Sequence, residues 1–185
     1  MKCLISNWID YKDGLYDQNY LPYKFKLICQ GTKDGFSRSV FEQKCYNIKQ
    51  TVSIIKIKNT GELVGGYNPV CWNIKEKSLN EVYYIKTYKS FIFKIDKDEI
   101  IISRVKDPGS AIFHSEQKIY ETKDGIKFHE KTINFDDLRM YNGINNYPYC
   151  HYYSLSYENN LNLKNKNRNS HLIEDYEMYR IVKKN

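Results

Sequence analysis

The chain has 185 residues, of which 41% are hydrophobic and 15% aromatic, which fits one globular domain with a real core and excludes a disordered chain. Its formal net charge is +7, but the lysines are scattered singly rather than gathered in a patch, which argues against a nucleic-acid-binding protein. No apolar run approaches the ~20 residues that a membrane-spanning helix needs, so no transmembrane segment is predicted.

The cysteines indicate reduced thiols rather than a disulfide framework. Their number is odd, they form no CxxC pair, and the sequence has no secretory signal; they are Cys3, Cys29, Cys45, Cys71 and Cys150. The chain is therefore predicted to be intracellular and cytoplasmic. No zinc-ligand spacing relates the cysteines to the four histidines, so neither a metal nor another cofactor is predicted.

The first residues predict a short amphipathic helix. Apolar residues recur at helical spacing, at Leu4, Ile5, Trp8 and Ile9, before Asp13-Gly14 breaks the pattern. A helix this short is marginal alone and must pack on another element. We therefore separate residues 1–23, as a helical lead-in, from a domain over residues 24–185.

Residues 31–45 predict a turn followed by a helix. Asp34-Gly35 is a turn signal, and Ser37 can cap the helix by accepting a hydrogen bond from a backbone N–H of its first turn. Apolar residues then recur at helical spacing, at Val40, Phe41 and Cys45.

The rest of the chain predicts strands, in keeping with its many Tyr, Ile and Val residues. Residues 51–58 are apolar on both faces, as in a central strand, and residues 62–67 return as its hairpin partner. Residues 90–96 alternate, with Phe91, Phe93 and Ile95 facing inward, and residues 99–105 form the second hairpin. A last strand is predicted over residues 176–182. Short strands with tight turns favour a mostly β fold with minor α, an antiparallel β-sandwich flanked by short helices.

Several motifs in this order resemble those of the TLDc domain. They are Asp34-Gly35-Phe36-Ser37, then Phe41 and Cys45, then Gly65-Gly66-Tyr67 with Pro69 and Trp72, then Arg104, and finally Asp175-Tyr176-Glu177. The resemblance extends over nearly everything from Lys26 to Val182. It implies two packed sheets with a few short helices, and it makes the motif residues candidates for structural or binding roles.

Each motif residue also has a role that follows from its own chemistry. Phe36 is expected to anchor the core, and Gly65-Gly66 to allow a bulge or the close packing of Trp72. Arg104, inside a strand, is expected to pair with a carboxylate, at Asp175, Glu177 or Asp34.

The sequence departs from the family between residues 111 and 141. Members carry a glycine-rich segment followed by Asp-Leu, whereas Phe135-Asp136-Asp137-Leu138 has Asp136 in the place of the glycine. Residues 120–131 are altered or lengthened. The sequence leaves open whether a family function that relies on this segment is retained.

No catalytic set is predicted. The acids Glu42, Glu62 and Glu81 and the histidines show no convergent spacing, and the sequence around Ser37 is not G-x-S-x-G. Gly65-Gly66 lacks the lysine and hydroxyl residue of a phosphate-binding loop. Cys45 and Cys71 are the redox candidates, but the predicted helix would end near Cys45, and its dipole would disfavour a thiolate there.

Three functions are therefore considered. The resemblance implies a non-enzymatic interaction domain, linked to oxidative-stress resistance and to binding or regulating the peripheral sector of the vacuolar proton ATPase. An alternative is a direct redox-sensing or antioxidant protein that acts through cysteine. A further alternative is an adaptor that works with a BTB domain, since residues 1–23 resemble the end of the linker in fungal BTB–TLDc proteins.

Overall fold

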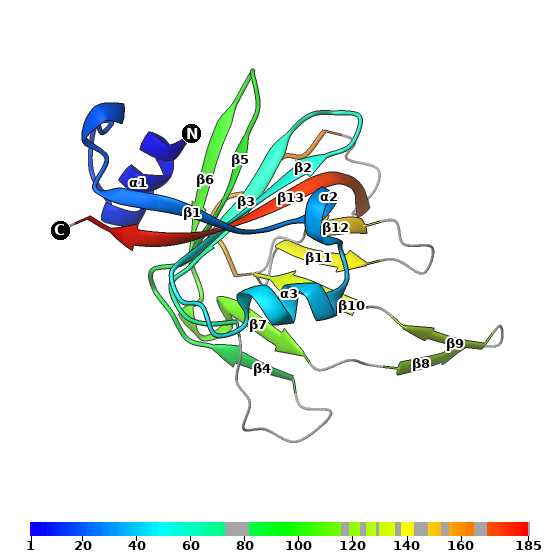
Figure 1. The fold of residues 1–185 in the computed structure, drawn as a ribbon. Coiled ribbons are helices and arrows are strands. Elements are labelled where there is room, and N and C mark those ends of the chain that lie inside the picture. Colours follow the sequence, from blue (N-terminus) through cyan, green and yellow to red (C-terminus); the bar gives the residue numbers. More distant parts are fainter. Residues whose placement is uncertain are drawn as a thin grey trace.

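The computed structural model describes residues 1–72, 82–115, 119–122, 125–128, 130–135, 138–142, 148–152, 156–164 and 170–184. These residues form a curled antiparallel sheet with short helices at its margins, which confirms the predicted mostly β class with minor α (Figure 1). The helices are α1 (Lys2–Asp10), α2 (Gly31–Asp34) and α3 (Arg38–Cys45), with 3-10 turns η1 (Gln18–Tyr20) and η2 (Pro108–Ser110).

The strands are β1 (Tyr23–Gln30), β2 (Thr51–Ile57), β3 (Leu63–Asn68), β4 (Val82–Ile85), β5 (Phe91–Ile95), β6 (Ile100–Arg104), β7 (Ile112–Ser115), β8 (Ile119–Thr122), β9 (Gly125–Phe128), β10 (Glu130–Asn134), β11 (Leu138–Asn142), β12 (Pro148–Tyr152) and β13 (Ser170–Lys183). The five predicted strands are present as β2, β3, β5, β6 and the later part of β13. Both predicted hairpins are confirmed, as β2–β3 and β5–β6.

The long strand β13 organises the largest sheet. This sheet has nine strands in the order β10-β11-β12-β13-β2-β3-β5-β6, with β1 also paired to β13. The start of β13 pairs with β12, its middle with β2 and its last half with β1, so β12 and β1 share one edge of β13. Strands β10 to β12 belong to this same sheet and do not form a second one. The packing of two separate sheets as a sandwich is therefore not confirmed and remains a prediction.

The centre of the sheet is buried on both faces. On one face Ile55 of β2 packs in an apolar cluster with Phe41 and Cys45 of α3 and with β11 and β12. On the other face Val52 and Ile54 pack with Phe91, Phe93 and α1. Strand β2 is therefore central, as predicted.

Strand β5 corrects one prediction. Phe91 and Phe93 are fully buried as expected, but Ile92, which faces the opposite side, is fully buried too, and Lys94 is only 2% exposed. The predicted contrast between an inner and an outer face is absent because a second layer covers the side that was expected to face water.

The predicted N-terminal helix is confirmed and lies against the sheet. The centroid of the Trp8 ring of α1 lies 5.8 Å from that of Phe91 and 5.5 Å from that of Phe93, and Ile5 is fully buried. Asn7 ties the following loop to the helix by accepting a hydrogen bond from the backbone N–H of Tyr16 at 2.9 Å. The division at residue 23 and the origin of this segment in a linker remain predictions.

The region that departs from the family contains a separate hairpin. Strands β8 and β9 pair only with each other among the described strands and project from the body (Figure 1). Phe135, just beyond β10, is fully buried. Asp136 and Asp137, on which the comparison with the family glycine depends, lie outside the described residues.

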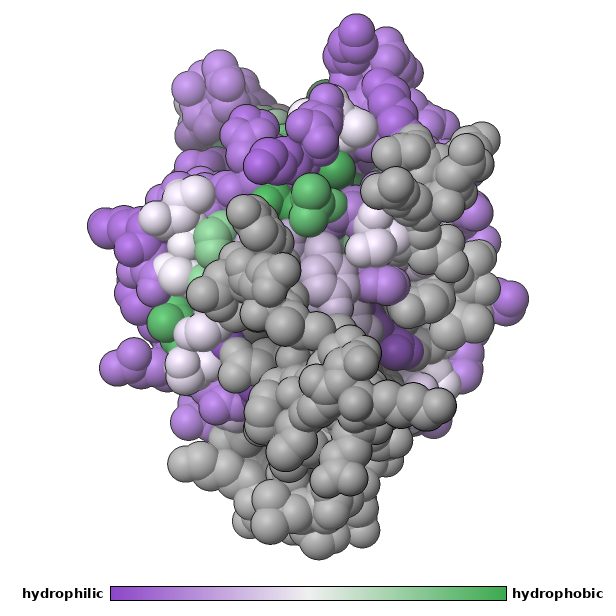
Figure 2. All heavy atoms as spheres, turned by 90° about the vertical axis from the view of Figure 1, so that its right-hand side faces the viewer, coloured by the Kyte–Doolittle hydropathy of each residue, from purple (hydrophilic) through white to green (hydrophobic). Residues whose placement is uncertain are grey.

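Figure 2 shows the face on the side of β8 and β9, where the described residues are mostly hydrophilic around a small hydrophobic group. No helix in the described part of the chain is both long and apolar enough to cross a membrane.

Candidate functional site

The motif residues at both ends of the chain meet where α2 and α3 approach β13. Helix α3 begins after Ser37, whose Oγ accepts a hydrogen bond from the N–H of Val40 at 3.4 Å, which confirms the predicted cap. Gly35 joins α2 to α3 with a φ of 107°, a conformation that side chains with a Cβ rarely adopt. The chain therefore turns at Gly35 as predicted, but Asp34 ends the short helix α2, which the sequence did not predict.

Asp175 of β13 holds the start of α2. Its Oδ1 accepts from the backbone N–H of Thr32 at 2.8 Å, and its Oδ2 accepts from the Gln30 side chain at 2.8 Å and the Thr32 hydroxyl at 3.0 Å. A carboxylate at this position satisfies a backbone donor that the helix itself leaves unpaired. Asp175 thus fixes a short helix that is too small to be stable alone.

Asp34 joins the end of α2 to α3. Its carboxylate accepts from the backbone N–H of Gln30 at 2.9 Å and from Lys44 Nζ at 2.8 Å. The hydrogen bond from Lys44 is the main reason that the pKa of Asp34 lies below its usual value. The carboxylate is thus used for holding two helices together.

Tyr176 is the buried centre of this corner. Its ring meets Phe36 edge to face with centroids 5.7 Å apart, and only 1% of the residue is exposed. Its hydroxyl donates to the carbonyl of Gly35 at 3.4 Å and lies 3.2 Å from Cys29 Sγ. Phe36 is half-buried and packs against the core, so its predicted role as an anchor agrees with its position.

Cys29 and Cys45 form a buried thiol pair beside Tyr176. A hydrogen bond between the two thiols, together with burial, raises the pKa of Cys45 and keeps it protonated. The pKa of Cys29 is lowered, first by that hydrogen bond and also by the Tyr176 hydroxyl. The sequence did not single out Cys29, because its position beside α3 depends on the pairing of β1 with β13.

A second group of motif residues lies along β3 and the segment that follows it. A Cβ on Gly66 would lie 2.5 Å from the Phe135 ring, and one on Gly65 would lie 2.0 Å from the backbone oxygen of Ser53. Gly66 is closely packed, but its partner is Phe135 and not the predicted Trp72. The alternative prediction, a bulge, is wrong, because β2 and β3 pair in unbroken register.

Trp72 links this second group to α3. Its ring lies 5.6 Å from both Phe41 and Phe135, and its Nε1 donates to Thr51 Oγ1 at 2.8 Å. The neighbouring motif residues have other contacts: Tyr67 stacks on Phe91 at 5.4 Å, Pro69 is half-buried, and Glu177 accepts a hydrogen bond from Tyr179 at 2.7 Å.

Arg104 lies apart from both groups, and its predicted carboxylate partners are wrong. It donates to the carbonyl of Trp8 at 2.9 Å, and its guanidinium lies 3.8 Å from the centroid of the Tyr11 ring. Strands β2, β3 and β5 separate it from β13, which carries Asp175 and Glu177. Arg104 therefore fastens α1 to the sheet.

The acids and histidines considered for catalysis are dispersed. Glu42 of α3 accepts a hydrogen bond from Tyr46, the residue that follows this helix, whereas the carboxylate of the buried Glu62 lies 3.4 Å from Lys94 Nζ. His171 is buried, and burial lowers its pKa. Glu81 and His129 lie outside the described residues. Among the residues that are described, no group of three or more His, Cys, Asp or Glu could hold a metal ion.

Comparison with known proteins adds one finding. The family model described as the TLDc domain matches residues 3–182. In a search of curated proteins, no sequence matches this chain.

Proposed function

Because the chain belongs to the TLDc domain family, we propose that it is a non-enzymatic domain that binds and regulates a protein partner. The family match carries this proposal. It is supported by the motif residues themselves, since Asp34 and Asp175 use their carboxylates to hold α2 and α3 in place. Such residues build a rigid surface rather than a reaction centre.

The family resemblance gives the partner to test first, the peripheral sector of the vacuolar proton ATPase, with a role in resistance to oxidative stress. The test adds purified protein to vacuolar membranes and follows release of that sector and loss of ATP hydrolysis. Stoichiometric release is expected. Phe36→Asp, which places a charge against Tyr176, is the control for loss of the fold.

A cysteine-based redox role is the second candidate, and the Cys29–Cys45 pair favours it. One molecule of hydrogen peroxide would take the two thiols to a disulfide and give two molecules of water. Mass spectrometry after mild peroxide treatment is the test. A Cys29–Cys45 disulfide that Cys45→Ala abolishes would support this role, and unmodified thiols at these positions and at Cys71 would exclude it.

A further inference from the structure

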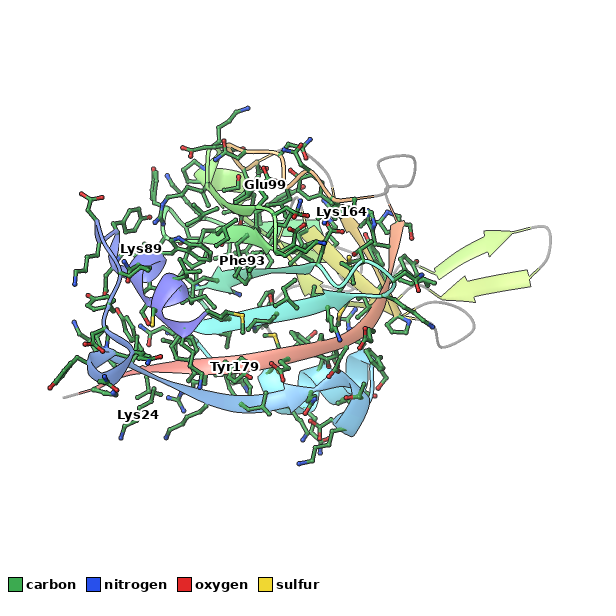
Figure 3. All side chains as sticks on the ribbon, turned by 90° about the horizontal axis from the view of Figure 1, so that it is seen from above. Lys24, Lys89, Phe93, Glu99, Lys164 and Tyr179 are labelled. Carbon is green, nitrogen blue, oxygen red and sulfur yellow. The ribbon has the colours of Figure 1, made fainter. Side chains whose placement is uncertain are left out.

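Strand β1 leaves one edge open along the large sheet. It pairs only with β13 among the described strands, and it is the outermost strand of its layer (Figure 3). The pairing is regular from Tyr23 to Leu27, where a register shift follows. The open stretch is therefore short, and its pairing is regular up to that irregularity.

The hydrogen-bond pattern shows which backbone groups face outward. The N–H of Lys184 donates to the carbonyl of Pro22 at 2.8 Å, so the pairs Lys24–Val182 and Lys26–Arg180 are the hydrogen-bonded ones. Tyr23, Phe25 and Leu27 then direct their N–H and C=O groups away from β13. No hydrogen bond from the described residues reaches these outward groups.

The two faces of this edge differ in chemistry. Lys24, Lys26 and Arg180 are exposed on one face, where Lys26 and Arg180 are directly opposite each other. None of the three forms an ion pair with a carboxylate of the described residues. On the other face Leu27 is 48% exposed beside the half-buried Phe25. Lys24 points away from the body of the protein (Figure 3).

Charge decides between two kinds of strand that could pair here. A second copy of β1 would bring its lysines opposite Lys24 and Lys26, and like charges across a strand pair are destabilising. An extended acidic segment would instead place carboxylates two residues apart opposite the lysines. Apolar residues between them would face Phe25 and Leu27.

We propose that the β1 edge binds an extended peptide segment of alternating acidic and apolar residues, which adds a strand to the sheet. This inference rests on the proposed function and specifies the chemistry of the partner. Main-chain hydrogen bonds supply the attachment, and the basic face selects the sequence.

The first test removes one outward N–H. An octapeptide of alternating glutamate and valine is titrated calorimetrically into the protein, into Leu27→Pro and into Leu27→Val. Proline is tolerated on an edge strand where the N–H faces solvent, so Leu27→Pro should fold yet bind at least about tenfold more weakly. Leu27→Val keeps the N–H and should bind as the wild type does. No binding by the wild type, or equal binding by Leu27→Pro, would overturn the proposal.

The second test reverses the charge. The variant Lys24→Glu/Lys26→Glu should bind the glutamate–valine peptide at least about tenfold more weakly than the wild type does. It should bind a lysine–valine octapeptide at least about tenfold more tightly. Lys97→Glu, at an exposed site away from β1, should change neither affinity by that amount. If the wild type is a dimer and Leu27→Pro is a monomer, the occupant of the β1 edge is a second copy of the chain and the proposal is overturned.

The vacuolar assay separates this inference from the proposed function. Release by the wild type and by Leu27→Pro alike would keep the regulatory function and reject β1 as its contact. Peptide binding without release would keep the edge and move the partner elsewhere.

Discussion

The ring of Phe135 covers β3 at Gly66. Substitution of this glycine should therefore lower the stability of the protein measurably. A Cβ there would lie 2.5 Å from the ring, and the packed core leaves the ring little room to move. Gly66→Ala should lower the free energy of unfolding by about 1 to 3 kcal/mol, the usual cost of overpacking. Chemical denaturation measures it.

Gly109→Ala is the matched control, since the nearest atom to a Cβ there is a side-chain oxygen of Asp107 at 3.3 Å. A loss for Gly66→Ala no larger than that for Gly109→Ala would contradict the assignment.

Lys94 is the second residue whose substitution should lower the free energy of unfolding. Its Nζ lies 3.4 Å from the fully buried Glu62 and donates to the carbonyl of Asn162 at 2.9 Å. Lys94→Met would leave Glu62 buried without its cation, and unfolding should become easier by about 3 to 5 kcal/mol.

Adding Glu62→Gln to Lys94→Met removes the uncompensated charge and should recover part of the loss. Simple addition of the two single losses would show that the residues are not coupled.

The roles of single residues were predictable from the sequence only in part. Local signals were sufficient for Ser37 as a cap and for the turn at Gly35, because the chemistry involved spans only a few residues. The partner of Arg104 and the place of Cys29 were missed, since both depend on strand order. Cys29 meets Tyr176 across 147 positions of sequence, and no local pattern records such a contact.

Helix α2 depends on a single side chain from a distant strand. Asp175→Ala removes the acceptor for the Thr32 backbone N–H and hydroxyl, and should cost about 1 kcal/mol, as loss of a helix cap does. Amide hydrogen exchange should rise in α2 while β2 and β3 stay protected. Unchanged exchange in α2 would show that Asp175 does not hold it.

Elements of the sheet were predictable where turn signals delimited them. The hairpins β2–β3 and β5–β6 follow from Asn59-Thr60-Gly61 and Asp96-Lys97-Asp98. The burial of both faces of β5 was not predictable, because it requires knowing that the sheet curls back over Ile92. The predicted sandwich rested on short strands with tight turns, which show where strands form but not how they are divided between sheets.

The stability of the folded protein should depend on pH through the turn between β5 and β6. Asp96 accepts hydrogen bonds from the backbone N–H of Asp98 and lies 3.1 Å from Lys164 Nζ, which together lower its pKa to about 2. Its charged form is favoured in the folded state, so it stabilises the protein above about pH 4, and that contribution is lost as the pH falls towards 2. Figure 3 shows Lys164 and Glu99 at this end of the sheet.

Denaturation between pH 6 and pH 2 is the measurement. The stability of Asp96→Asn should fall less steeply with acid than that of the wild type, whereas Asp13→Asn, at an exposed site, should follow the wild type. Identical slopes for all three proteins would reject the role of Asp96.

The place of β13 also has a consequence for synthesis on the ribosome. The strand joins β12, β2 and β1, yet residues 170–183 leave the ribosome after every other strand described. Until then no strand joins β1 to β2, because β13 is the strand that pairs with both. Their apolar faces stay exposed until these contacts of long sequence separation form, and such contacts form slowly. The nascent chain should therefore stay open to proteases and chaperones until β13 emerges, and become resistant only then.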